Sequence, residues 1–273
     1  MTNFLIALGC SFTYGEGLSY ELVSEKYKKT YDYIKSMGNH KNIYEFMFEV
    51  SVQYKEFDEY RIKNNYPTLL KNLLNVELYT NGENGGANIN RMHDLNRLMD
   101  FLNKEPELAP KYCVFQITHS GRDMQEIINP NGNQSTHDLL LNVYGEEFYN
   151  KVNQNDMNKK NLWGLDNLID EANHIFIKKL IEKFNILEKK YGTKCLFYMG
   201  LGEHHVIKDS YNKYSSYPYF FELKHGNVIY YTQLQMINEL NWTLDGSIGV
   251  KDNHPNKFAH KWLADKIYNK FLQ

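Results

Sequence analysis

The hydrophobic residues of the chain form short continuous runs that alternate with longer segments of helical periodicity. The runs at 3–9, 112–118 and 194–199 are stopped by glycine or polar residues, as is typical of strands buried on both faces of a parallel sheet. The segment 76–79 alternates between apolar and polar residues and predicts a further strand. The segment 227–231 is a candidate fifth strand.

Between the predicted strands, apolar residues recur at the spacing of one helical face. Helices are predicted on this basis at 66–74, 89–102, 165–189 and 256–271. Asn256 can cap the last helix, because an asparagine side chain accepts hydrogen bonds from the first backbone N–H groups of a helix. The alternation of strands and helices predicts an α/β fold, namely a three-layer α/β/α sandwich with a parallel, flavodoxin-like sheet.

We interpret residues 1–273 as a single domain that carries two insertions. The first insertion, at about 19–65, is rich in tyrosine and charged residues, and its patchy helical periodicity predicts a helical excursion from the sheet. Its tyrosines can line a pocket or pack the insertion against the body of the protein. The second insertion, at about 129–160, is polar and rich in asparagine, which predicts an excursion at the surface.

The composition gives no reason to expect a polyanionic partner. Lys and Arg number 31 and Asp and Glu 33, so the formal net charge is -2, and no global field favours nucleic acid or an anionic membrane. Cys10, Cys113 and Cys195 are an odd set without paired spacing, which favours reduced thiols and a cytoplasmic location. The N-terminal segment lacks the basic start and long apolar stretch of a signal peptide, so we expect none.

Three polar segments are expected at the carboxyl edge of the sheet, where ligands bind in folds of this class. Ser11 follows the strand 3–9 in a turn flanked by glycines, so we expect its hydroxyl at the mouth of the sheet. The glycines at 85–86 can present backbone N–H groups to an oxyanion, and 252–255 adds an aspartate and a histidine before the last helix. A serine, glycine amides and an Asp/His pair are the components of acyl-transfer catalysis.

These segments resemble the sequence blocks of the SGNH/GDSL hydrolase family, including its phage-encoded members. Residues 9–15, Gly-Cys-Ser-Phe-Thr-Tyr-Gly, resemble the first block, with Cys10 where the family usually has Asp. Residues 81–88 resemble the second block, with Gly86 at the position of the oxyanion-hole glycine. Residues 252–256 resemble the last block, which carries the Asp and His of the triad. Roughly half of the chain is comparable with the family, and the insertions are not.

Two features depart from the family pattern. The family places its aspartate three residues before the histidine, whereas here Lys251 holds that position, Asp252 lies two residues before His254, and Asp245 is an alternative acid. The third block usually ends its strand in Gly-X-Asn-Asp, but residues 118–122 read Thr-His-Ser-Gly-Arg, which is similar to a variant in phage relatives. The resemblance therefore leaves open both the triad acid and the side chain that replaces the asparagine donor.

By resemblance, the protein is an esterase that forms an acyl-enzyme on Ser11, with His254 as general base and Asp252 as the acid that orients it. The substrate would be an ester, such as an O-acetyl group on a carbohydrate or another hydroxylated small molecule. The resemblance implies no cofactor and no metal, and a cytoplasmic location in the host cell if the protein is phage-encoded. The candidates for oxyanion or substrate binding are Gly86, Asn88, Ser120 and Arg122.

Two other interpretations compete with this one. A non-catalytic or acyl-transferring binding protein of the same fold would fit the irregular third block, and a nucleotide- or nucleic-acid-processing protein would use Arg122 and the tyrosine-rich insertion. Cys10 is interpreted as a packing residue rather than a thiol nucleophile, and His260 as packed or exposed. The histidine pair at 204–205 does not predict a metal site, because adjacent side chains of an extended segment point in opposite directions.

Overall fold

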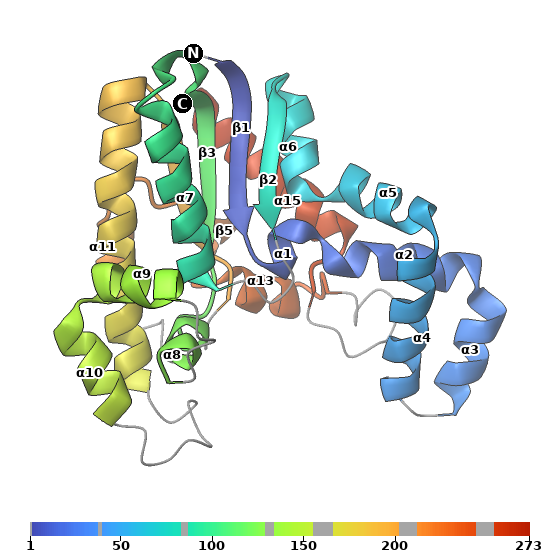
Figure 1. Ribbon diagram of the computed structural model, residues 1–273. Helices are drawn as coiled ribbons and strands as arrows, with labels where there is room; N and C mark the ends of the chain where they lie inside the picture. Colours follow the sequence, from blue (N-terminus) through green and yellow to red (C-terminus); the bar gives the residue numbers. More distant parts are fainter. Residues whose placement is uncertain are drawn as a thin grey trace.

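The computed structural model describes residues 2–37, 40–82, 87–128, 134–154, 166–201, 212–243 and 254–273. At its centre is a four-stranded parallel sheet with the strand order β2-β1-β3-β4 (Figure 1). The strands are β1 (Thr2–Gly9), β2 (Glu77–Gly82), β3 (Pro110–Ile117) and β4 (Lys194–Met199). The prediction of an α/β fold with a parallel sheet is therefore confirmed.

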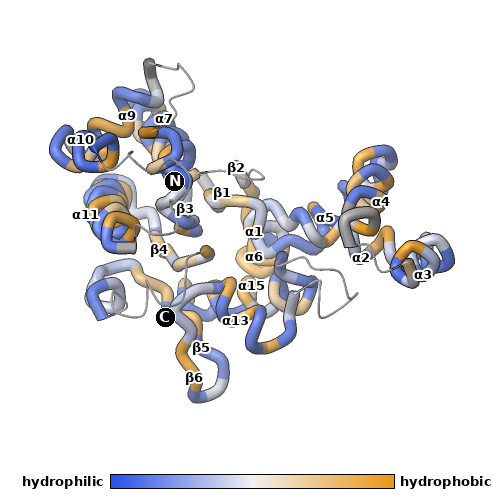
Figure 2. The backbone as a smooth tube through the Cα atoms, turned by 90° about the horizontal axis from the view of Figure 1, so that it is seen from below, coloured by the Kyte–Doolittle hydropathy of each residue, from blue (hydrophilic) through white to orange (hydrophobic). Residues whose placement is uncertain are grey.

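Helices cover both faces of this sheet, and side chains of the strands alternate between them. Ile6 and Leu8 of β1 point to one face and Leu5 points to the other. The first face is covered by α7 (Asn88–Leu102) and α11 (Asp166–Tyr191). The second face is covered by α6 (Tyr66–Leu74), α13 (Gln233–Glu239) and α15 (Lys257–Leu272), as Figures 1 and 2 show. Because both faces are buried, the strands need apolar residues at successive positions.

The first insertion forms helices that extend away from the sheet (Figure 1). Part of it buries a small hydrophobic cluster of its own, which includes Tyr20, Met47 and Phe57. The insertion therefore has a small hydrophobic core of its own, in addition to its contacts with the rest of the protein. Its helices, with the short helix that precedes them, are α1 (Ser11–Tyr14), α2 (Glu16–Lys26), α3 (Lys28–Ser36), α4 (His40–Gln53) and α5 (Lys55–Asn64).

The second insertion differs from the predicted surface excursion. Its described part forms helices whose apolar side chains, among them Leu140, Phe148 and Val152, belong to the main hydrophobic core. Within each helix the apolar residues lie on one face, but the many polar residues between them make this helical periodicity hard to recognise in the sequence. The helices of this region are α8 (Gly121–Ile128), α9 (Gln134–Tyr144) and α10 (Glu146–Gln154).

The candidate fifth strand forms, but it does not join the parallel sheet. β5 (Leu223–His225) and β6 (Val228–Tyr230) pair antiparallel as a separate hairpin. The turn between them is Gly226-Asn227, a composition that suits tight two-residue hairpins. Among the helices in the described ranges, none has both the length and the apolar character that crossing a bilayer requires.

Candidate active site

Ser11 lies at the carboxyl edge of the sheet, directly beyond β1. It is the first residue of α1, and its side chain is almost fully buried, with a relative exposure of 4%. In the strand order β2-β1-β3-β4, the connections that leave β1 and β3 diverge, so a topological switch point lies between these strands. Ligands bind at such points in open α/β sheets. The serine therefore lies where this class of fold forms its binding crevice.

His254 lies beside α1, although it is far from Ser11 in the sequence. Its ring packs edge-on against the ring of Phe12, the residue after Ser11, with 5.6 Å between the ring centroids. The start of α15 fixes this position, because the Asn256 side chain accepts hydrogen bonds from the N–H groups of Phe258 and Ala259. The last helix thus brings the histidine to the edge of the sheet where the serine lies.

A carboxylate faces His254, and sequence reasoning did not identify it. Oε2 of Glu16 lies 3.2 Å from Nε2 of His254, and both side chains are largely buried, with exposures of 9% and 19%. Gly15 makes this contact possible: it lies between α1 and α2 with a φ of 78°, a left-handed conformation that glycine adopts without strain. The only available signal was an acidic residue in the first turn of the helix that follows the serine turn.

The hydrogen bonds of the described residues include none between the Ser11 hydroxyl and the His254 ring. The ring is held by Glu16 and by the contact with Phe12. In unliganded active sites, catalytic hydrogen bonds are often long and shorten only when substrate binds. A hydroxyl, an imidazole and a carboxylate therefore lie on or beside the short helix α1, without a hydrogen bond between the hydroxyl and the imidazole.

Beneath the serine turn lies a buried polar network centred on Gln116 of β3. Its Oε1 accepts hydrogen bonds from the Cys10 backbone N–H at 3.2 Å and from the Thr13 hydroxyl at 2.7 Å. Its Nε2 donates to Oε1 of Gln233 at 3.0 Å. Gly9 permits this close packing, since a Cβ there would lie 2.0 Å from Oγ1 of Thr13. The backbone on both sides of Ser11 is therefore held in place by β3.

The structure supports the packing interpretation of Cys10. The side chain is fully buried, and burial raises the pKa of the thiol above its ordinary value, while the positive charge of Arg122 acts in the opposite direction. A raised pKa disfavours the thiolate, which is the nucleophilic form. Arg122 lies in the first turn of α8, so its charge reaches the same edge of the sheet from the β3 side.

The two proposed replacements for the asparagine donor are both engaged inside the protein. Asn88 accepts a hydrogen bond from the Thr118 backbone N–H at 2.8 Å and donates to the Thr118 carbonyl at 3.0 Å. The Ser120 hydroxyl donates to Oδ1 of Asn173 at 2.5 Å. Asn88 and Ser120 are fully buried. These contacts join the end of β3 to α7 and α11.

The same network includes a buried acid. Oδ1 of Asp123 accepts a hydrogen bond from the Ile89 backbone N–H at 3.0 Å, and its other oxygen accepts one from the Tyr144 hydroxyl. Burial raises the pKa of Asp123 to about 6, although both hydrogen bonds act to lower it. Asn88, Ser120 and Asp123 thus form a buried, hydrogen-bonded polar network on the β3 side of the sheet's carboxyl edge.

His260 is packed in the core. Its Nδ1 accepts a hydrogen bond from the Tyr66 backbone N–H at 3.2 Å, and the two rings are stacked. Burial, with a smaller contribution from His254, lowers the pKa of His260 to about 3, so the ring is neutral at ordinary pH. The histidine therefore has a structural position, unlike His254.

Several predicted residues lie outside the described ranges: Gly86, Lys251, the two candidate acids Asp252 and Asp245, and the segment 203–205. Within those ranges, no group of three His, Cys, Asp or Glu side chains is placed to hold a metal ion. Comparison of the sequence with known protein-family models and with curated proteins found no match. The assignment of a function therefore depends on the motifs and on the geometry around Ser11 and His254.

Proposed function

We propose that the protein is a serine esterase of the SGNH/GDSL type, with Ser11 as nucleophile and His254 as general base. The observation that supports this proposal best is the contact of His254 with Phe12 and Glu16, which sets an imidazole and a carboxylate next to the serine turn. The motif resemblance supports it independently, because the same serine and histidine were selected from the sequence alone.

In the proposed reaction, the Ser11 hydroxyl transfers its proton to His254 while its oxygen attacks the carbonyl carbon of an ester. The C–O bond to the alcohol then breaks, and the alcohol leaves with the proton from His254. A water molecule next transfers a proton to His254 and attacks the acyl-enzyme. The acid product leaves, and the Ser11 oxygen regains its proton.

Glu16 is proposed to hold the imidazole in one tautomer. A neutral imidazole has one N–H and one acceptor nitrogen, so a carboxylate on Nε2 favours the tautomer whose Nδ1 accepts a proton. The carboxylate would also stabilise the imidazolium that forms after proton transfer. Asp252 and Asp245 are the alternatives for this role on the basis of sequence.

Charge on the tetrahedral intermediate is proposed to be stabilised by the backbone N–H groups of Ser11 and Gly86, as the resemblance implies. Each donor to an oxyanion typically lowers the barrier by about 3 kcal/mol. The positive charge of Arg122, which is close enough to influence Cys10, would favour the same anionic state. Asn88 and Ser120 would contribute indirectly, by fixing the end of β3.

A non-catalytic binding protein of the same fold is the second candidate. One observation favours it: the Ser11 side chain is nearly buried, and within the described residues it has no hydrogen bond to His254. Such a protein would bind a ligand in the crevice without forming an acyl-enzyme.

Labelling with a fluorophosphonate and turnover of p-nitrophenyl acetate test the proposal. The wild type is expected to react with both, and Ser11→Ala is expected to lose both. Ser24→Ala is the matched control, because Ser24 is a buried serine whose hydroxyl donates only to the Glu21 carbonyl of its own helix. Equal rates in the wild type and Ser11→Ala would refute the proposal. A wild type that neither labels nor turns over ester would favour the binding protein.

A further inference from the structure

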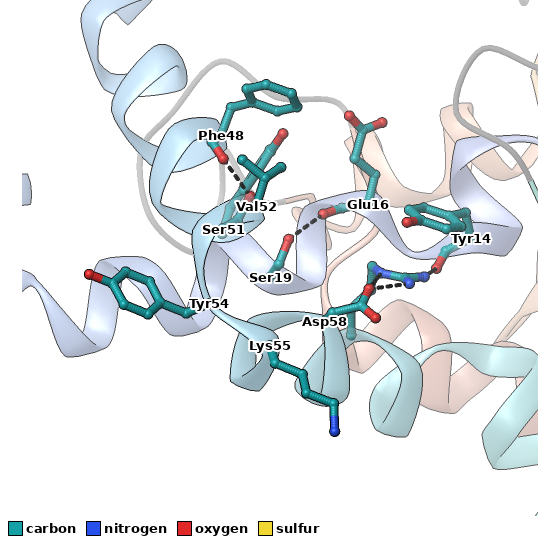
Figure 3. Close-up of a pocket in the computed structure, with 11 residues that line it drawn as sticks. Tyr14, Glu16, Ser19, Phe48, Ser51, Val52, Tyr54, Lys55 and Asp58 are labelled. Atoms are coloured by element: carbon teal, nitrogen blue, oxygen red, sulfur yellow. Dashed lines mark hydrogen bonds and ion pairs between the residues drawn. The ribbon is translucent and has the colours of Figure 1, made fainter.

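The first insertion contains a pocket beside the proposed catalytic groups. The pocket has a volume of about 700 Å³, within the range of sites for small ligands. It lies between α2, α4 and α5, and Figure 3 shows Phe48, Ser51 and Val52 of α4 facing Glu16 and Ser19 of α2. The sheet contributes no residue to its lining.

Glu16 connects this pocket to the proposed site. It lines the pocket, and the same carboxylate contacts Nε2 of His254 at 3.2 Å. Tyr14, the last residue of the short helix that Ser11 begins, also lines the pocket. A ligand in the pocket would therefore lie against the residues that adjoin the nucleophile and its base.

The charges that line the pocket balance, and the cations are engaged in contacts within the protein. The Arg61 guanidinium lies 3.5 Å from the centroid of the Tyr14 ring, donates to the Tyr14 carbonyl at 2.8 Å and pairs with Asp58 at 2.5 Å. Lys55 pairs with Glu59 at 2.9 Å. Two carboxylates, Glu16 and Asp58, offset these two cations in the lining. Among the described residues of the lining, each cation contacts a carboxylate, so this part of the pocket favours a neutral ligand over a phosphate.

The rest of the lining combines aromatic faces with oxygen acceptors. Phe48 and Tyr54 both line the pocket, and about half of each residue is exposed, 46% and 48%. The hydroxyls of Ser19 and Ser51 donate to carbonyls of their own helices, so their oxygens are directed to act as acceptors for a ligand. The faces of a sugar ring present C–H groups, and its edge presents hydroxyl donors. Aromatic rings and oxygen acceptors together match both surfaces.

We propose that this pocket binds a neutral saccharide, which carries the ester that Ser11 attacks. The inference rests on the proposed function for the reaction, but the binding of the saccharide does not depend on catalysis. The pocket would hold the sugar ring on the aromatic side chains of α4 and the segment before α5. Glu16 would lie at the boundary between the bound sugar and the reacting ester.

Binding is tested with the full chain by calorimetry and saturation-transfer NMR, with maltotriose, cellotriose and chitotriose as neutral probes and AMP as an anionic probe. At least one neutral saccharide is expected to bind, and AMP is not. The double variant Phe48→Ala/Tyr54→Ala is expected to weaken saccharide binding about tenfold or more, since such stacked aromatic residues commonly dominate a binding site. Val52→Trp, at a residue with 65% exposure, is expected to block the pocket without disturbing the core.

Tyr33→Ala is the matched control, because Tyr33 is an exposed tyrosine of the same insertion that does not line the pocket. It is expected to bind saccharide like the wild type. The proposal is overturned if no neutral saccharide binds at millimolar concentration, if AMP binds in their place, or if the pocket variants bind as tightly as Tyr33→Ala. Fluorophosphonate labelling of Ser11 in the same samples shows separately whether the proposed esterase chemistry holds.

Discussion

The β3 side and the β1 side of the sheet's carboxyl edge differ in how their polar groups are used. On the β3 side, Asn88, Ser120 and Asp123 are fully buried, and each makes hydrogen bonds to neighbouring elements. On the β1 side, His254 is 19% exposed, and its contacts include the Glu16 carboxylate and the Phe12 ring. The comparison assigns the first side a scaffold role, and the proposed function places the reacting groups on the second side.

Replacement of His254 should give the largest effect on activity. His254→Ala is expected to lower kcat/KM for p-nitrophenyl acetate by about 1,000-fold or more, since it removes the general base of the proposed mechanism. The free energy of unfolding should fall by only about 1–2 kcal/mol, less than for a fully buried histidine, because the side chain is 19% exposed. Steady-state kinetics and urea unfolding measure the two quantities.

His260→Ala is the matched comparison for this histidine. His260 is fully buried and accepts a hydrogen bond from the Tyr66 backbone, so its loss should destabilise the protein by about 2–4 kcal/mol. The activities of His254→Ala and His260→Ala are compared under conditions in which the same fraction of each variant is folded. Equal losses of activity would contradict the assignment of one histidine to catalysis and the other to structure.

Removal of the carboxylate on His254 should have the next largest effect. Glu16→Gln is expected to lower kcat for p-nitrophenyl acetate by about 100-fold with a small change in KM, because this substrate has no saccharide and Glu16 then acts through the base alone. Glu16→Asp should restore part of the lost kcat. An unchanged kcat in Glu16→Gln would transfer the role to Asp252 or Asp245, which the same assay on Asp252→Asn and Asp245→Asn would identify.

On the scaffold side, substitution should affect stability more than chemistry. Asn88→Ala leaves the buried N–H and C=O of Thr118 without their side-chain partner, so a loss of about 2–3 kcal/mol in the free energy of unfolding is expected. Asn72→Ala, at an exposed position of α6, is the control and should change stability by less than about 0.5 kcal/mol. Equal stabilities of the two variants in urea unfolding would contradict the scaffold interpretation.

Two buried structural groups, His260 and Asp123, should respond in opposite directions to acid. The pKa of His260 is lowered by burial from 6.5 to about 3, so its contribution to stability is present above about pH 6.5 and is lost as the pH falls towards 3. The pKa of Asp123 is raised by burial from 3.8 to about 6, so its contribution is present at low pH and is lost as the pH rises through 6.

Unfolding curves between pH 4 and 7 test this contrast. Over this range, His260→Gln should be less destabilised by acid than the wild type, because it no longer carries a group that must stay neutral. Asp123→Asn should be more destabilised by acid, because it lacks the carboxyl group whose protonation favours the folded state. If the free energy of unfolding depends on pH in the same way in the wild type and in both variants, then neither His260 nor Asp123 changes its pKa on folding.

Much of the α/β fold could be predicted from the sequence, because the patterns that indicate its strands and helices each lie within a short stretch of the chain. The continuous apolar run before Ser11 reflects a strand buried on both faces, and Asn256 caps the final helix as predicted. The polar second insertion was predicted wrongly as a surface excursion, because a few apolar residues at helical spacing, such as Leu140 and Val143 of α9, are enough to pack it into the core.

The contacts that shape the candidate site depend on tertiary structure, and the sequence does not reveal them. Glu16 meets His254 only because the chain bends at Gly15 and the last helix returns to β1. Gln116 lies inside an apolar run that reads as a uniform strand, yet its amide holds the serine turn. No periodicity or motif marks these residues, since their partners lie far away in the sequence.

Site-resolved mass spectrometry of the fluorophosphonate adduct can show whether Ser11 and His254 act as a pair. If they do, the wild type carries the adduct on Ser11, and His254→Ala, when folded, forms it at a greatly reduced rate. An adduct on another residue, or labelling of Ser11 at an unchanged rate in His254→Ala, would contradict this pairing.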